Sequence, residues 1–261
     1  MPERTQYAPG TPSWVDIQTT DTAGAKAFYG ALFGWEYNDR PAGHDADGNP
    51  AIYSLAVKNG KEVAAIAPIP MAGVPPHWNT YVTVADVDKS AAQVPEAGGT
   101  VMMPPFDVMD AGRMSVVADP TGAMVCLWQV KNTIGAQLVN EHGTLTWNEL
   151  MTSDIPAATA FYEKLFGWKA NALETPGMEY TELKLNDRAG GGAMKLPMEG
   201  MPPAWGVYFA VDDCDKAAET ATANGGTVVQ APMDIPPGRM AVIIDPAGAY
   251  FNVIKMAQPV D

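Results

Sequence analysis

Basic residues, cysteine and histidine are all scarce in this sequence of 261 residues. Lys and Arg together number 16 against 30 Asp and Glu, so the formal net charge is −14. Nucleic acids and anionic membranes are bound through basic surfaces, which a chain of this charge lacks. We therefore expect neither nucleic acid nor membrane as a partner, and a small molecule as the ligand.

The two cysteines, Cys126 and Cys214, exclude a disulfide framework and any Cys-x-x-Cys zinc or redox motif. No apolar run is long enough to span a bilayer, and the first seven residues contain no apolar signal-peptide core. Glycine-rich nucleotide-binding motifs and the Gly-x-Ser-x-Gly motif of serine hydrolases are missing as well. We expect a cytoplasmic protein without a signal peptide and without a nucleotide site.

What the sequence does contain is an internal repeat. Residues 14–21 recur 133 positions later at 147–154, and Leu-Phe-Gly-Trp at 32–35 recurs at 165–168. Farther along, Asp-Pro-x-Gly-Ala at 119–123 recurs after only 126 positions, so the second copy is shorter, mostly around residues 42–50. The repeat predicts two homologous domains, 10–131 and 142–257. They are expected to pack together, because the joining segment has no long Gly/Ser or Pro tract.

Each copy predicts the order strand, helix and then further strands. Alternating residues over 14–19 indicate a strand. Asp21 is typical of a helix N-cap, apolar residues follow at helical spacing, and Gly34 is typical of a helix end. Strands over 51–57 and 63–69 follow, then a second unit with a strand over 80–84, a helix from Asp86 to about 94, and strands at 100–103, 114–118 and 124–129. The fold class is α+β, with four βαβββ units in the chain.

Two motifs carry a resemblance to a known family. Phe-Tyr-x-x-Leu-Phe-Gly-Trp at 28–35 and 161–168, together with Asp-Pro-x-Gly-Ala, resembles the vicinal-oxygen-chelate superfamily of glyoxalase I, extradiol dioxygenases and bleomycin-binding proteins. The chain is similar to tandem actinobacterial glyoxalase-like proteins, some of them known as mycobacterial antigens. The resemblance implies two tandem glyoxalase-like domains, each of two βαβββ units forming a half-open mixed barrel around a cleft. It also implies a monomer whose domains pack as a pseudo-dimer.

Catalytic members of that superfamily place metal ligands at fixed strand positions. In this chain those positions hold Trp14, Asn79, Trp147, Gly206, Cys126 and Asn252. Indole and glycine side chains cannot coordinate a metal, and a lone cysteine needs partners to bind zinc. We therefore expect no metal and no other cofactor. An off-register site made of Asp16, His77 and Cys126 stays open as the alternative.

The candidate catalytic residues are Glu149, Asp16 and His77. Asp16 and Glu149 alternate in step with Trp14 and Trp147, which the resemblance places inside the clefts. A carboxylate in an apolar pocket has a raised pKa and can act as a general acid or base, and a histidine at the cleft mouth can shuttle protons. The structural alternative is a buried carboxylate that holds a backbone amide or an indole N–H, with His77 facing solvent.

The candidate ligand-binding residues offer flat aromatic faces, amides or guanidinium groups. They are Trp14, Gln18, Asn79, Tyr81, Trp128, Trp147, Tyr208, Asn252, Arg113 and Arg239. As an alternative, the aromatic residues belong to the core, and each arginine pairs with the aspartate of the nearby Asp-Pro turn.

These residues favour the binding of a small aromatic or hydrophobic molecule in a metal-free cleft. The first alternative is a glyoxalase-, lyase- or hydroxylase-type enzyme of aldehyde detoxification or secondary metabolism that uses Asp16 and Glu149 as acid or base. The second is a secreted, antigen-like interaction protein, which only the resemblance supports. A binder needs its tryptophans for affinity, whereas an enzyme needs one of the carboxylates for rate.

Overall fold

A computed structural model describes residues 2–175 and 178–258 of the chain. Each half contains two helices and eight strands among these residues. The first half has β1 (Pro12–Thr19), α1 (Thr22–Phe33), β2 (Glu36–His44), β3 (Pro50–Lys58), β4 (Lys61–Pro68), β5 (His77–Thr83), α2 (Val87–Gln93), β6 (Thr100–Val108), β7 (Gly112–Ala118) and β8 (Met124–Val130). The second half has β9 (Leu145–Thr152), α3 (Ile155–Phe166), β10 (Lys169–Thr175), β11 (Met178–Leu185), β12 (Arg188–Lys195), β13 (Ala204–Ala210), α4 (Cys214–Ala223), β14 (Thr227–Ile235), β15 (Gly238–Ile244) and β16 (Tyr250–Met256).

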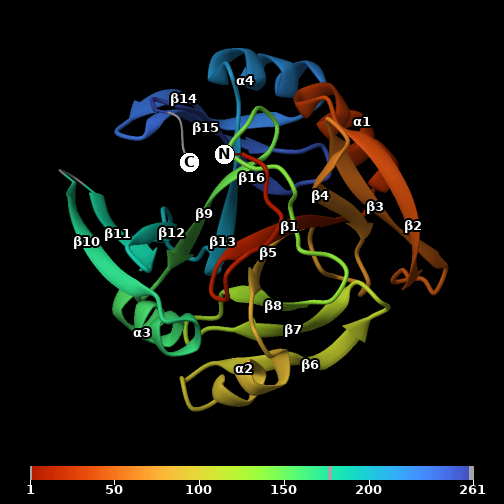
Figure 1. Ribbon diagram of the computed structural model, residues 1–261. Coiled ribbons are helices and arrows are strands. Elements are labelled where there is room, and N and C mark those ends of the chain that lie inside the picture. The colour runs from red at the N-terminus through yellow and green to blue at the C-terminus, as the bar shows by residue number, and fades with distance from the viewer. Residues whose placement is uncertain (1, 176–177, 259–261) are drawn as a thin grey trace.

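The strands form two mixed sheets of the same topology (Figure 1). The first has the order β2-β3-β4-β1-β5-β8-β7-β6, and the second repeats it as β10-β11-β12-β9-β13-β16-β15-β14. Within each sheet the two βαβββ units meet at a central antiparallel pair, β1 with β5 and β9 with β13. The α+β class and the tandem βαβββ units expected from the sequence are confirmed. No helix in the described part of the chain has both the length and the apolar character needed to cross a bilayer.

The helix boundaries follow the predicted signals. The Asp21 carboxylate accepts a hydrogen bond from the Gly24 N–H at 2.8 Å and so caps the first turn of α1. Gly34 ends the helix with a φ of 71°, a left-handed conformation that glycine adopts at little cost. Asp154 and Gly167 do the same for α3.

Strand β2 was not predicted from the sequence. Most of its residues are exposed on both faces, so no alternation of apolar and polar residues marks it. It pairs with β3 as an antiparallel hairpin, which leaves only residues 45–49 of the predicted 42–50 loop outside a strand. Strand β6 likewise extends beyond the predicted 100–103, with register shifts along its proline-containing stretch.

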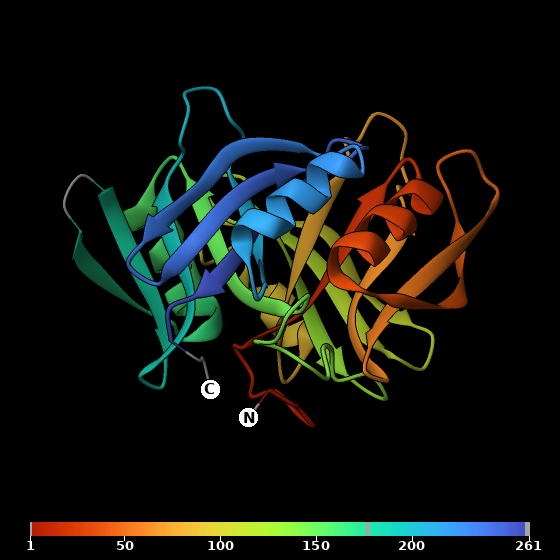
Figure 2. The same ribbon diagram turned by 90° about the horizontal axis from the view of Figure 1, so that it is seen from above.

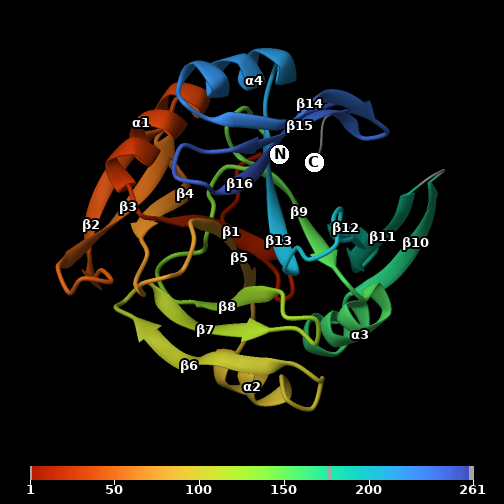
Figure 3. The ribbon, with the colours of Figure 1, turned by 180° about the vertical axis from the view of Figure 1, so that it is seen from behind.

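The two halves pack against each other through their helix-bearing faces (Figures 1 and 3). Phe28 and Phe33 of α1 contact Phe251 and Phe209 of the second sheet, with ring centroids 6.0 and 4.9 Å apart. On the other side, α3 shares a buried cluster with β7 and β8 of the first sheet. Figure 2 shows the two sheets side by side, with α1 and α4 adjacent between them. Most of the hydrophobic core therefore lies between the halves.

Hydrogen bonds between the halves obey the same pseudo-symmetry. Tyr162 donates to Asp119 Oδ2 at 3.1 Å and accepts from Trp205 Nε1 at 2.9 Å. The counterpart is Tyr29, which donates to Asp245 Oδ2 at 3.0 Å and accepts from Trp78 Nε1 at 3.2 Å. Trp35 and Trp168 complete the pattern by donating, each at 2.7 Å, to the carbonyls of Gly143 and Gly10. The Phe-Tyr-x-x-Leu-Phe-Gly-Trp motif is thus the contact motif between the two halves.

The pseudo-symmetry fails at one buried hydroxyl. Within the described part of the chain, Thr146 Oγ1 is buried without a hydrogen-bond partner. Its counterpart, the Ser13 hydroxyl, accepts from Thr83 Oγ1 at 2.8 Å, but the position of Thr83 is held by Ala210 in the second half. We expect Thr146→Val to raise the free energy of unfolding by up to about 1 kcal/mol, because an unpaired buried hydroxyl is replaced by a methyl group of similar shape. Urea unfolding measures the change.

The matched variant Ser13→Ala breaks a formed hydrogen bond and is expected to lower the free energy of unfolding by about 1 kcal/mol. If Thr146→Val lowered the free energy of unfolding as much as Ser13→Ala does, the Thr146 hydroxyl would have to form a hydrogen bond in the native state.

Candidate functional site

All candidate site residues except Arg113 and Arg239 lie on or beside the face of each sheet that points away from its helices. The first inner face is the cluster around Asp16, which includes Trp14, Tyr53, Tyr81, Cys126 and Trp128. The second inner face is the cluster around Glu149, which includes Trp147, Tyr180, Tyr208, Met240 and Ile254. The alternation of β1 and β9 thus brings each predicted carboxylate together with its predicted tryptophan.

Asp16 is the centre of a hydrogen-bond network and is only 2 % exposed. Its Oδ2 accepts from the hydroxyls of Tyr53 at 2.9 Å and Tyr81 at 2.7 Å, and its Oδ1 accepts from Asn79 Nδ2 at 2.9 Å. Trp14 Nε1 donates to the Tyr53 hydroxyl at 2.9 Å. Burial raises the pKa of Asp16, while the hydrogen bonds from Asn79 and the two tyrosines act in the opposite direction.

The segment that joins the two halves covers the first inner face. The Thr133 carbonyl accepts from Trp128 Nε1 at 2.9 Å, and the Ala136 N–H donates to the Ser13 carbonyl at 2.7 Å. Tyr7, near the N-terminus, donates to the Ala136 carbonyl at 2.6 Å. Ala136 and Val139 belong to the same buried cluster as Trp14. The joining segment therefore covers the part of the first inner face that holds Trp14 and Trp128, and both indoles are buried.

Glu149 has a smaller network that is less deeply buried. The Tyr208 hydroxyl donates to Glu149 Oε2 at 2.6 Å, the Tyr180 hydroxyl also bonds the carboxylate, and Trp147 Nε1 donates to Tyr180 at 3.1 Å. Burial raises the pKa of Glu149, and the two tyrosine hydrogen bonds oppose that rise. Glu149 is 8 % exposed, and both Trp147 and Tyr180 are only half-buried. The second inner face thus presents a half-buried Trp147 and Tyr180 beside a carboxylate that is more exposed than Asp16.

The neighbours of the two carboxylates differ. Asp16 lies between Ala65 and Asn79 on the adjoining strands, whereas Glu149 lies between Gly192 and Gly206. A Cβ on Gly192 would collide with the Tyr180 hydroxyl, so glycine is required there for the tyrosine to lie across the strand. Neither strand neighbour of Glu149 therefore carries a side chain, and the Tyr180 ring occupies the space over Gly192.

The two inner faces also differ in polarity, at one equivalent position of β3 and β11. Leu55 belongs to the buried cluster of the first inner face. Its counterpart two residues after Tyr180 is Glu182, whose carboxylate pairs with Lys184 at 3.0 Å and accepts from Asn171 Nδ2 at 3.2 Å. The second inner face is therefore the more polar of the two.

The remaining predicted residues of the sheet interior lie close to these networks. Gln18 is half-buried and faces His77 across the β1–β5 pair. His77 Nδ1 is 2.9 Å from the Pro75 carbonyl oxygen, and the positive charge of a protonated His77 would lower the pKa of Asp16. Asn252 donates to the Val207 carbonyl at 3.2 Å.

Arg113 and Arg239 lie apart from the inner faces, on the helix side of each sheet. Arg113 binds Asp88 through two hydrogen bonds of 2.7 and 2.8 Å, and Arg239 binds Asp215 through two of 2.6 and 2.8 Å. The alternative pairing with the Asp-Pro turns is wrong. The Asp119 carboxylate is occupied by backbone N–H groups of its own turn and by the Tyr162 hydroxyl.

Sequence reasoning missed Tyr53 and Tyr180, which link each carboxylate to its tryptophan. A signal for them exists. Tyr180 follows Tyr53 by 127 positions, the same shift that relates Tyr81 to Tyr208. Aligning the repeat through β3 and β11 would have identified both tyrosines.

The residues present do not fit the metal that the fold family implies. In the described ranges, no three or more His, Cys, Asp or Glu residues are placed to hold a metal ion. Trp14 and Trp147, at two of the expected ligand positions, donate their indole N–H groups to tyrosines. In the off-register alternative, the Asp16 carboxylate already accepts three hydrogen bonds, and burial raises the pKa of the Cys126 thiol and keeps it protonated.

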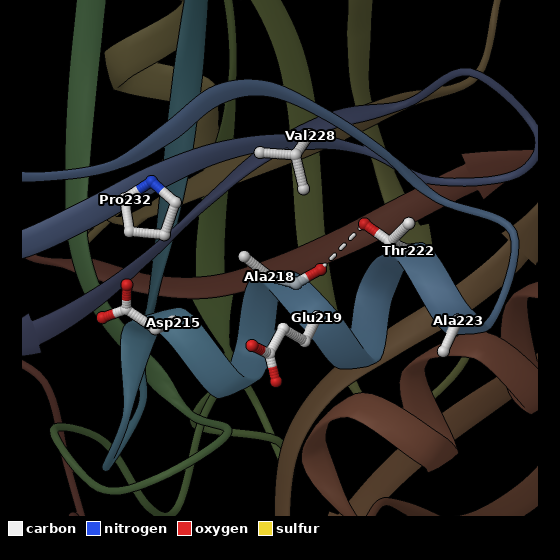
Figure 4. Close-up of a pocket in the computed structure, with 7 residues that line it drawn as sticks. All are labelled: Asp215, Ala218, Glu219, Thr222, Ala223, Val228 and Pro232. Carbon is white, nitrogen blue, oxygen red and sulfur yellow. Dashed lines mark hydrogen bonds between the residues drawn. The ribbon is translucent and has the colours of Figure 1, made fainter.

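Two surface hollows lie elsewhere. One, of about 550 Å³, lies between α4 and β14 and is lined by Asp215, Glu219, Thr222, Val228 and Pro232 among others (Figure 4). The second, of about 280 Å³, lies beside the start of α1. In the first hollow the Asp215 carboxylate is held by Arg239, and Thr222 Oγ1 donates to the Ala218 carbonyl at 3.0 Å. Both groups already have partners, and the residues predicted from the sequence gather at the carboxylate networks instead.

Family comparison agrees with this architecture. The sequence pattern of the Glyoxalase/Bleomycin resistance protein/Dioxygenase superfamily matches residues 11–127 and again 144–253. The chain belongs to this superfamily. Two solved structures show the same fold at low sequence identity: the 2,3-dioxygenase LapB from Pseudomonas sp. KL28 and a Mn(II)-bound glyoxalase from Novosphingobium aromaticivorans, each with a TM-score of 0.67. They share 15 % and 16 % identity, cover 98 % and 97 % of this chain, and are covered to 96 % and 84 % themselves.

Two full-length relatives of this superfamily member are closer in sequence. The protein CFP32 of Mycobacterium tuberculosis is 53 % identical over 98 % of this chain and 99 % of its own length. The anthracycline biosynthesis protein DnrV of Streptomyces peucetius is 34 % identical over 97 % of this chain and 96 % of its own length.

Proposed function

We propose that this superfamily member binds a small aromatic or hydrophobic molecule on its second inner face, in a metal-free site. The observation that carries the proposal is the half-exposed Trp147, bonded through Tyr180 to a buried carboxylate, Glu149. Indole and phenol rings offer flat surfaces for planar ligands, and a carboxylate between them fixes orientation.

The surroundings of Trp147 support an aromatic ligand. Met240, Met256 and Val242 pack in the same cluster, and methionine adapts its shape to varied partners. The relatives named for anthracycline biosynthesis favour a planar polycyclic molecule as the class to test first. The first inner face is a poorer candidate, because residues 133–139 cover its tryptophans.

Calorimetric titration with a hydroxyanthraquinone tests the proposal. We expect saturable binding to the wild-type chain and an affinity about tenfold lower in Trp147→Phe, which loses ring area and the bond to Tyr180. The equivalent change on the covered face, Trp14→Phe, is expected to leave the affinity within about twofold. An equal loss in both variants, or no saturable binding by the wild-type chain, would overturn the proposal.

A second candidate function is catalysis with Glu149 as general acid or base. It is favoured by the raised pKa of Glu149, which keeps its proton exchange closer to neutral pH. Assays with 2-oxoaldehydes would then show turnover that falls about 100-fold or more in Glu149→Gln and is kept in Asp16→Asn. Unchanged turnover in Glu149→Gln would exclude this role for the carboxylate.

A further inference from the structure

Asp16 accepts one more side-chain hydrogen bond from the chain than Glu149 does. Asp16 accepts from two tyrosine hydroxyls and from the Asn79 amide. Glu149 accepts from the two equivalent tyrosines, but the strand position of Asn79 is held by Gly206, which has no side chain to donate.

The two positions are equivalent in the sheets. Asn79 lies directly opposite Asp16 in the β1–β5 pair, and Gly206 lies directly opposite Glu149 in the β13–β9 pair. A Cβ on Gly206 would lie 3.4 Å from Met151 Cε and from Asn252 Nδ2, so these two side chains border the position, and the Asn252 amide donates to the Val207 carbonyl. Glu149 is also one methylene longer than Asp16, which moves its carboxylate outward, in line with its greater exposure.

We propose that Gly206 opens a subsite in which the bound molecule itself supplies the missing donor to Glu149, as an amide or amine N–H. The inference deepens the proposed function and rests on it. A carboxylate accepts hydrogen bonds and cannot donate them when ionised, so the group beside it must be a donor. The first half shows where such a donor lies, because the Asn79 amide nitrogen is 2.9 Å from Asp16 Oδ1. The net charge of −14 disfavours an anionic ligand group at the same place.

The ligand class is therefore an aromatic molecule that carries a primary amide or an amine. Its ring lies against Trp147, and its N–H group points between Gly206 and the Glu149 carboxylate. Tyr180 and Tyr208 hold that carboxylate in position and leave it acceptor capacity for the ligand.

Three probes of one size test this assignment by calorimetry on the full chain: 2-naphthamide, methyl 2-naphthoate and 2-naphthoate. The amide is expected to bind about tenfold more tightly than the ester, which has no N–H, and the anion is expected to bind most weakly. Equal affinities for amide and ester would overturn the subsite and leave the proposed function intact. Failure of all three probes to bind would overturn both.

The variant Gly206→Asn supplies the donor from the chain. It is expected to weaken 2-naphthamide binding about tenfold and to remove the preference over the ester. Val229→Thr, at an exposed position of the edge strand β14, is the control and is expected to keep the preference. Thermal unfolding checks that each variant folds. If Gly206→Asn does not fold, Gly206→Ala serves, because its Cβ meets only contacts of 3.4 Å and narrows the same space. A preference for the amide that survives in a folded Gly206 variant would overturn the subsite.

Discussion

Replacing Tyr162 by phenylalanine is expected to lower the free energy of unfolding by about 2–4 kcal/mol. The hydroxyl donates to Asp119 Oδ2 at 3.1 Å and accepts from Trp205 Nε1 at 2.9 Å, in a fully buried contact between the two halves. Its removal leaves a buried carboxylate oxygen and a buried indole N–H without this partner, and each such group costs about 1–3 kcal/mol. Urea or thermal unfolding of the full chain measures the loss.

The pseudo-symmetric change Tyr29→Phe provides an independent repeat of the measurement. It breaks the bonds to Asp245 and Trp78, and we expect a loss of similar size. Because the two networks share no residues, the double variant should show the sum of the two losses. Tyr250→Phe, at a half-exposed ring, is the control and is expected to change the free energy by less than about 0.5 kcal/mol. Small losses in both single variants would mean that packing alone joins the halves.

Much of the fold could be predicted because its signals are local. The N-caps Asp21 and Asp154, the left-handed glycines Gly34 and Gly167, and the alternation along β1 act within a few residues of each other. The repeat then extends each local inference to the second half. The pairing of Trp14 with Asp16 on one face needed nothing more than the two-residue period of a strand.

The partners across the chain could not be predicted in this way. Tyr29 meets Asp245 from 216 residues away, and no periodicity encodes that contact. Arg113 and Asp88 are brought together only by the packing of α2 on β7. The covering of the first inner face also depends on where the joining segment runs, which its composition does not specify. Distant contacts of this kind decide how deeply each of two similar faces is buried.

Asp16→Leu is expected to destabilise the chain by at least about 3 kcal/mol. The leucine side chain offers no acceptor to the two phenol hydroxyls and the amide that donate to Asp16. The residue is 2 % exposed, so water cannot replace the carboxylate, and each donor left without an acceptor costs about 1–3 kcal/mol. Glu149→Leu leaves only two hydroxyls without an acceptor, at a more open face, and a smaller loss of about 1–3 kcal/mol is expected. Urea unfolding of the two variants compares them, and equal losses would contradict the difference in burial between the faces.

The ionisation of Asp16 makes the stability depend on pH with a defined sign. Burial raises the pKa of Asp16 and of Glu149 in the folded chain. The native state therefore holds these two protons to higher pH than the unfolded state does, so the contribution of Asp16 and Glu149 to the free energy of unfolding is largest below the unfolded pKa of about 4 and is lost as pH rises through the folded values. In Asp16→Asn the new amide oxygen can accept from both tyrosines, while the Asn79 amide turns to offer its oxygen to the new NH₂ group. That variant should fold and lose part of the fall above about pH 4, which urea unfolding at a series of pH values measures. An unchanged slope would mean that Asp16 has the same proton affinity in both states.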